Sequence, residues 1–265
     1  MNVIRKKKNI IGQLFAGVLL GSAALGAHAD AYEDGLMAYA VGNYTEAGQL
    51  LMRAADAGQD GAEHMLMRLF AEGKLQASDA AGETLKWTRK AAEKGLMQAQ
   101  FALAEIYLQQ HGDARAALPW YHRAAEQGHA EAYYRLGGLY ETGADGVGAD
   151  AAQSRHLFRI AASEFDVYAQ KGDDHAQFNL ATMYKQGKGV KKNMTLAMKW
   201  WEKSALQGNA MSQLSLGRVY ALGDGVDRDT YQATFWLQMA AAQGVGEAVA
   251  MLRDLEDGAR VALAM

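Results

Sequence analysis

The sequence predicts an all-α fold of stacked helix-turn-helix repeats, and three regular spacings support this prediction. A glycine closes each repeat, as Gly58, Gly95, Gly128, Gly172, Gly208 and Gly244. Twelve residues after the first five glycines lies an aromatic residue: Phe70, Tyr107, Tyr140, Tyr184 or Tyr220. Eight residues before five of the glycines lies a large apolar residue: Leu50, Trp87, Trp120, Trp200 or Trp236. Self-similarity at such a period is typical of repeat arrays.

The residues that follow each glycine predict the first helix of a repeat. A small side chain comes four residues after it and leucine eight residues after it, in the columns Ala62, Ala99, Ala132, Ala176, Ser212, Ala248 and Leu66, Leu103, Leu136, Leu180, Leu216, Leu252. Offsets of four, eight and twelve residues fall on one helix face. In the second helix, small pairs such as Ser204-Ala205 allow close approach of a neighbour. We expect Trp200 to fill the seam between repeats.

Glycine-containing loops connect the two helices of a repeat. They are plainest at residues 187–190 and 223–226, which both read Gly-x-Gly-Val. Glycine permits the positive φ that ends one helix and turns the chain tightly into the next. Neither helix could bury its large apolar face alone, whereas stacked neighbours could.

The motif Ala-x-x-x-Leu-x-x-x-Tyr-x-x-Gly-x-Gly-Val, followed by Ala-x-x-Trp-x-x-x-Ala-Ala-x-x-Gly, resembles the Sel-one-like repeat, a relative of the tetratricopeptide repeat. The resemblance covers roughly residues 35 to 255. It implies a right-handed superhelical solenoid of about six repeats with a C-terminal cap, which serves as an adaptor or scaffold. The family has no shared catalytic residue, so the resemblance implies no enzyme and identifies no partner.

The third and fourth repeats depart from the pattern in ways that predict local structure. Pro119, the only proline, lies next to Trp120 in the third repeat and predicts a late helix start or a kink, because proline lacks the backbone donor. The fourth repeat has seven extra residues before Gly172, about two helical turns. Since the stretch 163–171 contains neither proline nor glycine, we expect a lengthened second helix that projects past its neighbours.

The first 29 residues are typical of a secretory signal peptide. Arg5-Lys6-Lys7-Lys8 precede an apolar run from Ile10 to Leu25, and residues 27–29 read Ala-His-Ala, a small-x-small cleavage site. Cleavage would leave a solenoid domain of residues 30–265, periplasmic or secreted, with no stable membrane insertion. The alternative is a retained anchor, but Gly12, Gln13, Gly17 and Gly21 within the run, and Gly26 after it, make this segment weakly hydrophobic. Because the chain has no cysteine, a lipid-modified cysteine and a disulfide framework are both excluded.

Charge argues against nucleic acid as a partner. The whole chain has a net charge of −3, and loss of residues 1–29, with four basic and no acidic residues, would make it −7. Phosphate backbones are bound by basic surfaces, so we expect a protein or peptide partner.

Candidates for chemistry are few, and we expect no catalytic residue, cofactor or metal. The histidines form no His-x-x-x-His pair, and there is no cysteine to complete a zinc site. Residues 187–192, Gly-Lys-Gly-Val-Lys-Lys, follow a helix and lack the phosphate-loop ending. Aspartates such as Asp150 and Asp229 do not fall at calcium-loop spacing and suit helix N-caps. No serine stands in a Ser-x-x-Lys motif.

A second set of columns holds the candidate partner-binding residues. By analogy with the related repeat, positions six, ten and thirteen residues after the glycines face the concave side of the superhelix. They are His64, Phe101, Tyr134, Phe178, Arg68, Glu105, Thr182, Lys185 and Arg218. Such a face would suit an extended peptide or a partner helix, although regular recurrence also fits a purely architectural role. The insertion adds Phe165 and Tyr168, which either cover the adjoining repeat or bind a partner.

Two functional hypotheses follow. The first is a non-enzymatic protein-protein interaction scaffold or adaptor in the bacterial cell envelope, one version of which, suggested by the family, is immunity to a periplasmic toxin. The alternative is an exported enzyme or binder that acts on cell-wall peptides or β-lactams, which rests only on the resemblance and the leader.

Overall fold

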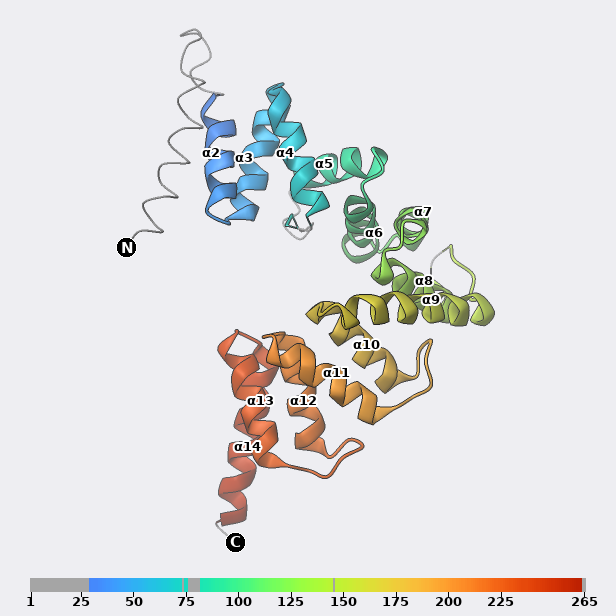
Figure 1. Cartoon of the computed structure of the whole chain (residues 1–265), viewed down its shortest axis with the longest axis vertical. Helices are drawn as coiled ribbons and strands as arrows, with labels where there is room; N and C mark the ends of the chain where they lie inside the picture. Colours follow the sequence, from blue (N-terminus) through green and yellow to red (C-terminus); the bar gives the residue numbers. More distant parts are fainter. Residues whose placement is uncertain (1–28, 73, 76–81, 145, 264–265) are drawn as a thin grey trace. The chain divides into compact units, whose positions relative to one another are not determined.

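A computed structural model describes residues 29–72, 74–75, 82–144 and 146–263 (Figure 1). These residues form thirteen α-helices and no named strand, which confirms the predicted all-α fold of helix-turn-helix repeats. The predicted signal peptide lies outside them, apart from Ala29, where the first described helix begins. Contacts group the chain into two compact units that divide between Leu96 and Met97.

The N-terminal unit contains four helices: α2 (Ala29–Ala40), α3 (Tyr44–Asp56), α4 (Asp60–Ala71) and α5 (Gly82–Glu93). Helix α3 packs against α2, α4 and α5. Leu51, Leu66 and Leu69 are fully buried, and the ring of Trp87 packs with them. The apolar residues of successive helices therefore close a small core of their own.

The C-terminal unit contains the other nine described helices, each packed on the next in the chain. They are α6 (Met97–His111), α7 (Ala114–Glu126), α8 (Ala130–Thr142), α9 (Ala151–Gln170), α10 (Asp174–Gln186), α11 (Met194–Leu206), α12 (Ala210–Leu222), α13 (Thr230–Ala242) and α14 (Gly246–Leu263). The even-numbered members are the predicted first helices of the repeats. Their leucine column is buried as predicted from Leu103 to Leu216.

Polar side chains fix where many of these helices begin. Asp150 accepts backbone N–H bonds from Ala152 and Gln153 at 2.9 Å, and Asp229 accepts one from Gln232 at 2.9 Å. Each carboxylate satisfies donors that have no partner within the helix. The predicted N-cap role of both aspartates is confirmed.

The second helices bury a column one residue later than the sequence pattern suggested. Seven residues before the closing glycines lie Leu51, Thr88, Tyr121, Trp201 and Leu237, all at most 2% exposed. In the predicted column, one residue earlier, Trp87 and Trp236 are buried as well, whereas Leu50, Trp120 and Trp200 are only half-buried. The expectation for Trp200 therefore needs correction: Trp200 packs at the edge of two clusters, with the Lys203 ammonium 4.2 Å from its ring centroid, and Trp201 fills the interior.

The third repeat does not start late. Helix α7 begins at Ala114, and Pro119 lies inside it with its side chain exposed, so the predicted late start is wrong. Asp113 caps this helix by accepting the Ala116 N–H at 2.8 Å. A strong cap upstream allows the helix to begin before the proline that would otherwise discourage it.

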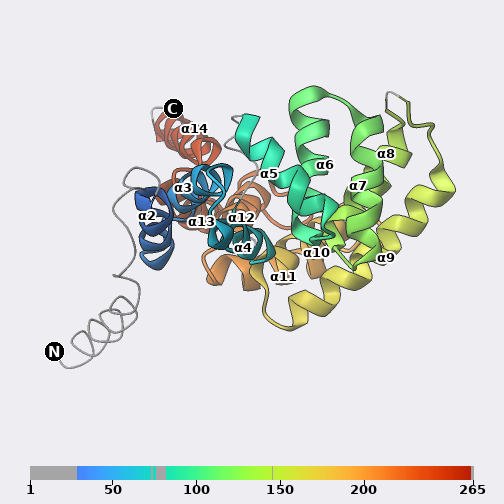
Figure 2. The ribbon, with the colours of Figure 1, turned by 90° about the horizontal axis from the view of Figure 1, so that it is seen from above.

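Helix α9 contains the predicted extension. It has 20 residues, whereas α7, α11 and α13 each have 13. Figures 1 and 2 show it as a long helix beside α8 and α10, with which it makes contact. Phe158 and Phe165, seven residues apart, are 2% and 4% exposed. The insertion therefore repeats the buried column on one helix face, through Phe165, and packs there against its neighbours, which corrects the expectation of a freely projecting end. Val167 and Tyr168 of the insertion are 46% and 42% exposed.

Candidate functional site

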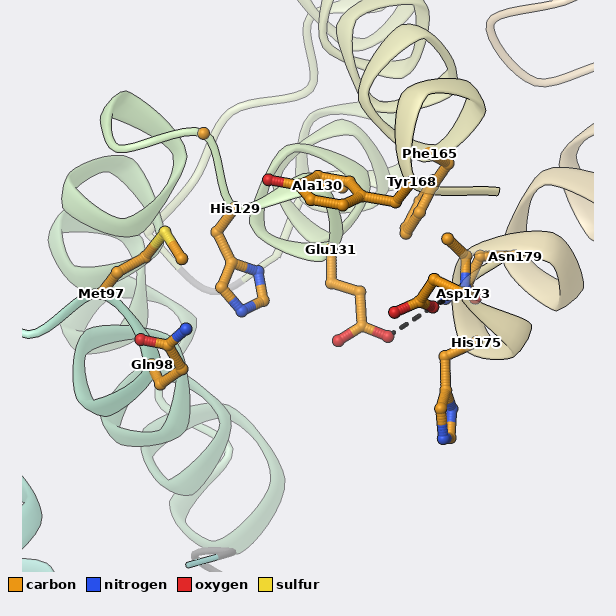
Figure 3. A pocket seen from close by; sticks show the side chains of 12 residues that line it. Met97, Gln98, His129, Ala130, Glu131, Phe165, Tyr168, Asp173, His175 and Asn179 are labelled. Carbon is orange, nitrogen blue, oxygen red and sulfur yellow. Dashed lines mark hydrogen bonds between the residues drawn. The ribbon is translucent and has the colours of Figure 1, made fainter. Parts of the chain in front are cut away.

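A cavity of about 360 Å³ lies in the C-terminal unit, at the fourth repeat (Figure 3). The N-terminal ends of α6, α8 and α10 and the C-terminal end of α9 surround it. The lining residues are Met97, Gln98, Gly128, His129, Ala130, Glu131, Phe165, Tyr168, Asp173, His175, Ala176 and Asn179.

The inserted turns of α9 explain why the cavity lies here. Phe158 packs against Gly137 of α8, as Leu237 of α13 packs against the equivalent Gly217 of α12. The α10 contact is made further along α9, where the Gln177 side chain donates to the Ala169 carbonyl at 3.0 Å. Helices α8 and α10 thus contact α9 at sites offset by the seven added residues, about 10 Å along the helix.

The residues of this added length form one wall of the cavity. Phe165 is 4% exposed and packs in the core, so of the two roles expected for it this side chain takes the covering one, although it also borders the cavity. Tyr168, one turn later, is 42% exposed and lines the cavity, as Figure 3 shows. The insertion therefore supplies one packing residue and one accessible aromatic residue.

A second cavity, of about 400 Å³, continues the first. It shares Glu131, His175 and Asn179 with it and extends to the N-terminal end of α12. Its other lining residues are Asp174, Phe178, Gly208, Asn209, Ala210, Met211 and Gln243. We call the two cavities together the first-helix groove.

The groove is rich in carboxylates. Glu131 reaches across the cavity and accepts a hydrogen bond from the Asn179 side chain at 3.2 Å (Figure 3). Asp173 caps α10 by accepting the Ala176 N–H at 2.7 Å, and Asp174 accepts a bond from the Asn209 side chain at 2.9 Å. No lysine or arginine is among the described residues that line either cavity. The groove therefore favours a cationic ligand group.

His129 closes the α6 side of the groove in its neutral form. Its ring stacks on Phe101 with centroids 4.3 Å apart, and its Nδ1 accepts the Ala132 N–H at 3.4 Å. Burial penalises the charged imidazolium and lowers the pKa of His129 to about 4. At neutral pH this histidine therefore acts as a helix cap and an aromatic surface.

The lowered pKa of His129 predicts a pH dependence of stability. In the unfolded chain this histidine has a pKa near 6.5 and takes up a proton below that pH. In the folded chain the same group is protonated only when the pH falls to about 4. Stability from this group is complete above about pH 6.5 and falls by about 2–3 kcal/mol as the pH drops toward 4. We expect His129→Asn to flatten this part of the curve, measured as urea unfolding free energy against pH.

Asparagine is a suitable control residue because Asn209 occupies the same N-cap position of α12 and accepts the Ser212 N–H at 3.0 Å. The variant loses the ring stacking on Phe101. This loss lowers the free energy of unfolding by the same amount at every pH and does not change its dependence on pH. An equal slope between pH 6.5 and 4 in the parent and in His129→Asn would contradict the assignment.

Several predicted partner-binding residues instead connect neighbouring repeats. Tyr134 of α8 donates to Gln186 of α10 at 3.1 Å. Thr182, in contrast, bonds within its own helix, where its hydroxyl donates to the Phe178 carbonyl at 3.0 Å. Three others form ion pairs across repeats: Glu105 with Arg135 at 2.9 Å, Lys185 with Asp224 at 2.9 Å and Arg218 with Glu247 at 3.2 Å. These contacts support the architectural interpretation of the column, while a role in recognition stays a prediction.

The remaining candidates fall in different places. Phe178 lines the second cavity, and Phe101 lies behind the first one through its stack on His129. In the N-terminal unit, His64 and Arg68 are exposed on α4, and the Arg68 guanidinium pairs with Glu72 at 2.7 Å. The structure therefore brings Phe178, Phe165 and Tyr168 to one groove and leaves His64 and Arg68 outside it.

Sequence reasoning missed the polar residues of the groove. The sequence analysis singled out none of them as site residues: Glu131, Asp173, Asp174, Asn179, His129 and His175. A signal was available, because five of these six residues lie within three positions after a closing glycine, on either side of the inserted turns. The N-terminal residues of the first helices on either side of an irregular repeat were therefore the positions from which a groove could have been predicted.

The serines of the later repeats have structural roles. Ser204 and Ser212 are fully buried; the Ser212 hydroxyl donates to Ser204 at 2.7 Å, and Ser204 donates to the Asp174 carbonyl at 2.8 Å. Ser215 donates to the Met211 carbonyl of its own helix at 2.8 Å.

Within the described ranges, no three His, Asp or Glu side chains are grouped to hold a metal ion. No helix among the residues described is long and apolar enough to span a membrane.

The fold and the groove define an all-α repeat protein of the protein-interaction class. The chain belongs to the Sel1 repeat family: the Sel1 repeat matches residues 22–59, 81–96, 98–129, 130–164, 174–209 and 210–245, well over half of its length. Scaffolds of this family are generally non-enzymatic protein-interaction folds. The predicted family is thus confirmed.

One solved structure supports this fold. A Sel1 repeat protein from Oxalobacter formigenes is 29% identical, with a TM-score of 0.53 over 84% of this chain and 86% of that one. Two others superpose with TM-scores below 0.5. The protective antigen c5321 of uropathogenic Escherichia coli has 27% identity and a TM-score of 0.43 over 88% of this chain and 57% of its own. The immunity protein Pa5087 of Pseudomonas aeruginosa has 17% identity and a TM-score of 0.44 over 84% of each chain. No match was found among curated proteins.

Proposed function

We propose that this chain is a non-enzymatic binding protein whose first-helix groove holds a basic segment of a protein partner. The observation that carries the proposal is the groove itself, which combines Glu131, Asp173 and Asp174 with accessible aromatic rings and lacks lysine and arginine among its described lining residues. A lysine or arginine side chain would pair with the carboxylates while its methylene stem packs on Phe178. The Tyr168 ring already has the Lys171 ammonium 5.4 Å from its centroid and would border the bound segment.

The leader supports an action in the cell envelope. Its basic start, apolar run and Ala-x-Ala ending favour export, with cleavage after Ala29. Such a cleavage would leave α2 whole except for its first residue. An envelope scaffold and an immunity protein against a periplasmic toxin are two versions of the same binding activity and differ only in the partner that is held.

Site-specific photocrosslinking in the producing cell tests the groove. The full chain, with its own leader, carries a photoreactive benzoylphenylalanine at Tyr168 or at Phe178. We expect both positions to crosslink to one protein, identified by mass spectrometry as a toxin, an envelope component or another partner. His156, which is exposed on the part of α9 that contacts α8, is the matched control and should give no crosslink.

Charge is tested by the double variant Glu131→Gln, Asp174→Asn. Both substitutions keep the side-chain shape and an oxygen acceptor for the neighbouring asparagines. We expect the crosslink yield at Tyr168 to fall about tenfold, because a basic segment loses its counter-charges. Equal yields at Tyr168 and His156, or an unchanged yield in the double variant, would refute the groove as the binding site. The mass of the purified protein shows separately whether it begins at Asp30.

A further inference from the structure

The outward face of α13 carries an exposed apolar stripe. Tyr231, Phe235 and Met239 are 78%, 45% and 36% exposed, respectively. They lie at intervals of four residues, so their side chains follow one another along a single helix face. Trp236 and Leu237 of the same helix point the other way and are buried in the core.

This stripe interrupts the repeat pattern. Counting back 13, 9 and 5 residues from the closing glycine, α13 has tyrosine, phenylalanine and methionine, where the other standard-length helices have polar, charged or proline residues. The equivalents are Thr195, Lys199 and Lys203 in α11, Arg115, Pro119 and Arg123 in α7, and Thr45, Gln49 and Arg53 in α3. All nine are exposed. The face is therefore a solvent face by architecture, and its apolar character in α13 is specific to this helix.

The charge distribution around the stripe indicates what covers it. Residues 230–246 contain no charged side chain, the longest such run among the described residues, in a chain with a net charge of −3. A membrane surface would call for lysine or arginine beside the apolar residues. A charged partner segment would find no counter-charge on α13. A second copy of this chain meets neither problem, because two like-charged molecules repel least where both surfaces are uncharged and apolar.

We propose that this chain forms a homodimer through α13, with Tyr231, Phe235 and Met239 packed against the same residues of a second copy. A closed two-fold contact places the same patch on both partners and is therefore self-complementary. In an antiparallel pair of α13 helices, Phe235 at the centre of the stripe lies next to its symmetry mate, and Tyr231 faces Met239 of the other copy. The stripe is thereby removed from water in both molecules.

Sedimentation equilibrium tests the proposal on the full purified chain. We expect a dimer at micromolar concentration. The triple variant Tyr231→Thr, Phe235→Lys, Met239→Lys copies the outward residues of α11, so it suits a helix of this fold. The triple variant should raise the dimer dissociation constant at least about 100-fold. Its helical circular dichroism and its Tm should equal those of the parent protein in its monomeric form. Leu206→Lys, which changes another apolar side chain that is 70% exposed, should leave the dimer intact.

The lack of cysteine allows a second measurement. Phe235→Cys should form a disulfide-linked dimer on mild oxidation, because the two-fold axis passes beside this residue. Lys199→Cys, at the equivalent position of α11, should stay monomeric under the same conditions. A monomer at tens of micromolar, a triple variant that dimerises like the parent, or equal disulfide yields at positions 235 and 199 would each overturn the proposal.

Discussion

Replacing Trp201 with alanine should lower the free energy of unfolding by about 3–5 kcal/mol, measured by urea unfolding followed by circular dichroism. The ring is 2% exposed and packs among Ala181 of α10, Leu216 and Val219 of α12, and Trp236 of α13. Its removal leaves a cavity between two neighbouring repeats that small neighbours such as Ala181 cannot fill. Because each repeat is stabilised by its neighbours, the loss extends beyond α11.

Two further variants separate burial from ring chemistry. Trp200→Ala, at the half-buried neighbouring position, should cost less than half as much. Trp201→Phe should cost about 1 kcal/mol or less, because the Trp201 indole N–H meets no acceptor among the described residues and phenylalanine removes this unsatisfied donor. A larger loss of unfolding free energy for Trp200→Ala than for Trp201→Ala would contradict this assignment and support the sequence prediction that Trp200 fills the seam between repeats.

Replacing Gly189 with alanine should cost about 3 kcal/mol or more and lower the Tm of the C-terminal unit. Gly189 has a φ of +70°, and a Cβ added there would lie 2.1 Å from the Phe158 carbonyl oxygen. The loop between α10 and α11 thus touches the backbone of α9, which cannot yield as a flexible side chain would. The loop would have to move away and withdraw Val190 from the cluster around Phe158.

Gly208→Ala is the matched control for this prediction. Gly208 also has a positive φ, +99°, but a Cβ added there would meet nothing within 4 Å. Its substitution should therefore carry only the backbone strain, about 1–2 kcal/mol. Losses of equal size at the two glycines would show that the contact with Phe158 adds nothing to the backbone strain.

Much of the fold was predictable because it rests on local regularities. The glycine, alanine and leucine columns predicted helix pairs, and Asp150 and Asp229 were correctly interpreted as N-caps. The insertion was predicted to lengthen a helix because it contained no glycine or proline and preserved the helix face. These features depend on spacing along one chain segment, which is what a sequence displays directly.

The sequence was less informative where two faces compete. Trp200 and Trp201 are adjacent, and both can pack against a neighbouring helix, so spacing alone could not show which ring the next repeat covers. The same limit applied to the α9 extension, since seven added residues can either project or offset the neighbouring helices. Only the contacts of Phe158 with α8 and of Ala169 with α10 decided between these arrangements.

The sequence by itself determined that this chain is a Sel1 repeat protein with helix pairs, capped helix starts and a lengthened second helix in the fourth repeat. Only the tertiary structure decided that this lengthening accompanies a groove lined by Glu131, Asp173 and Asp174. The physical reason is that helix formation is governed by nearby residues, whereas a groove is formed by helices whose relative positions depend on packing across repeats. Glu131 and Asp174 lie 43 residues apart in the chain (174 − 131) and line the same cavity only because α8 and α10 stack.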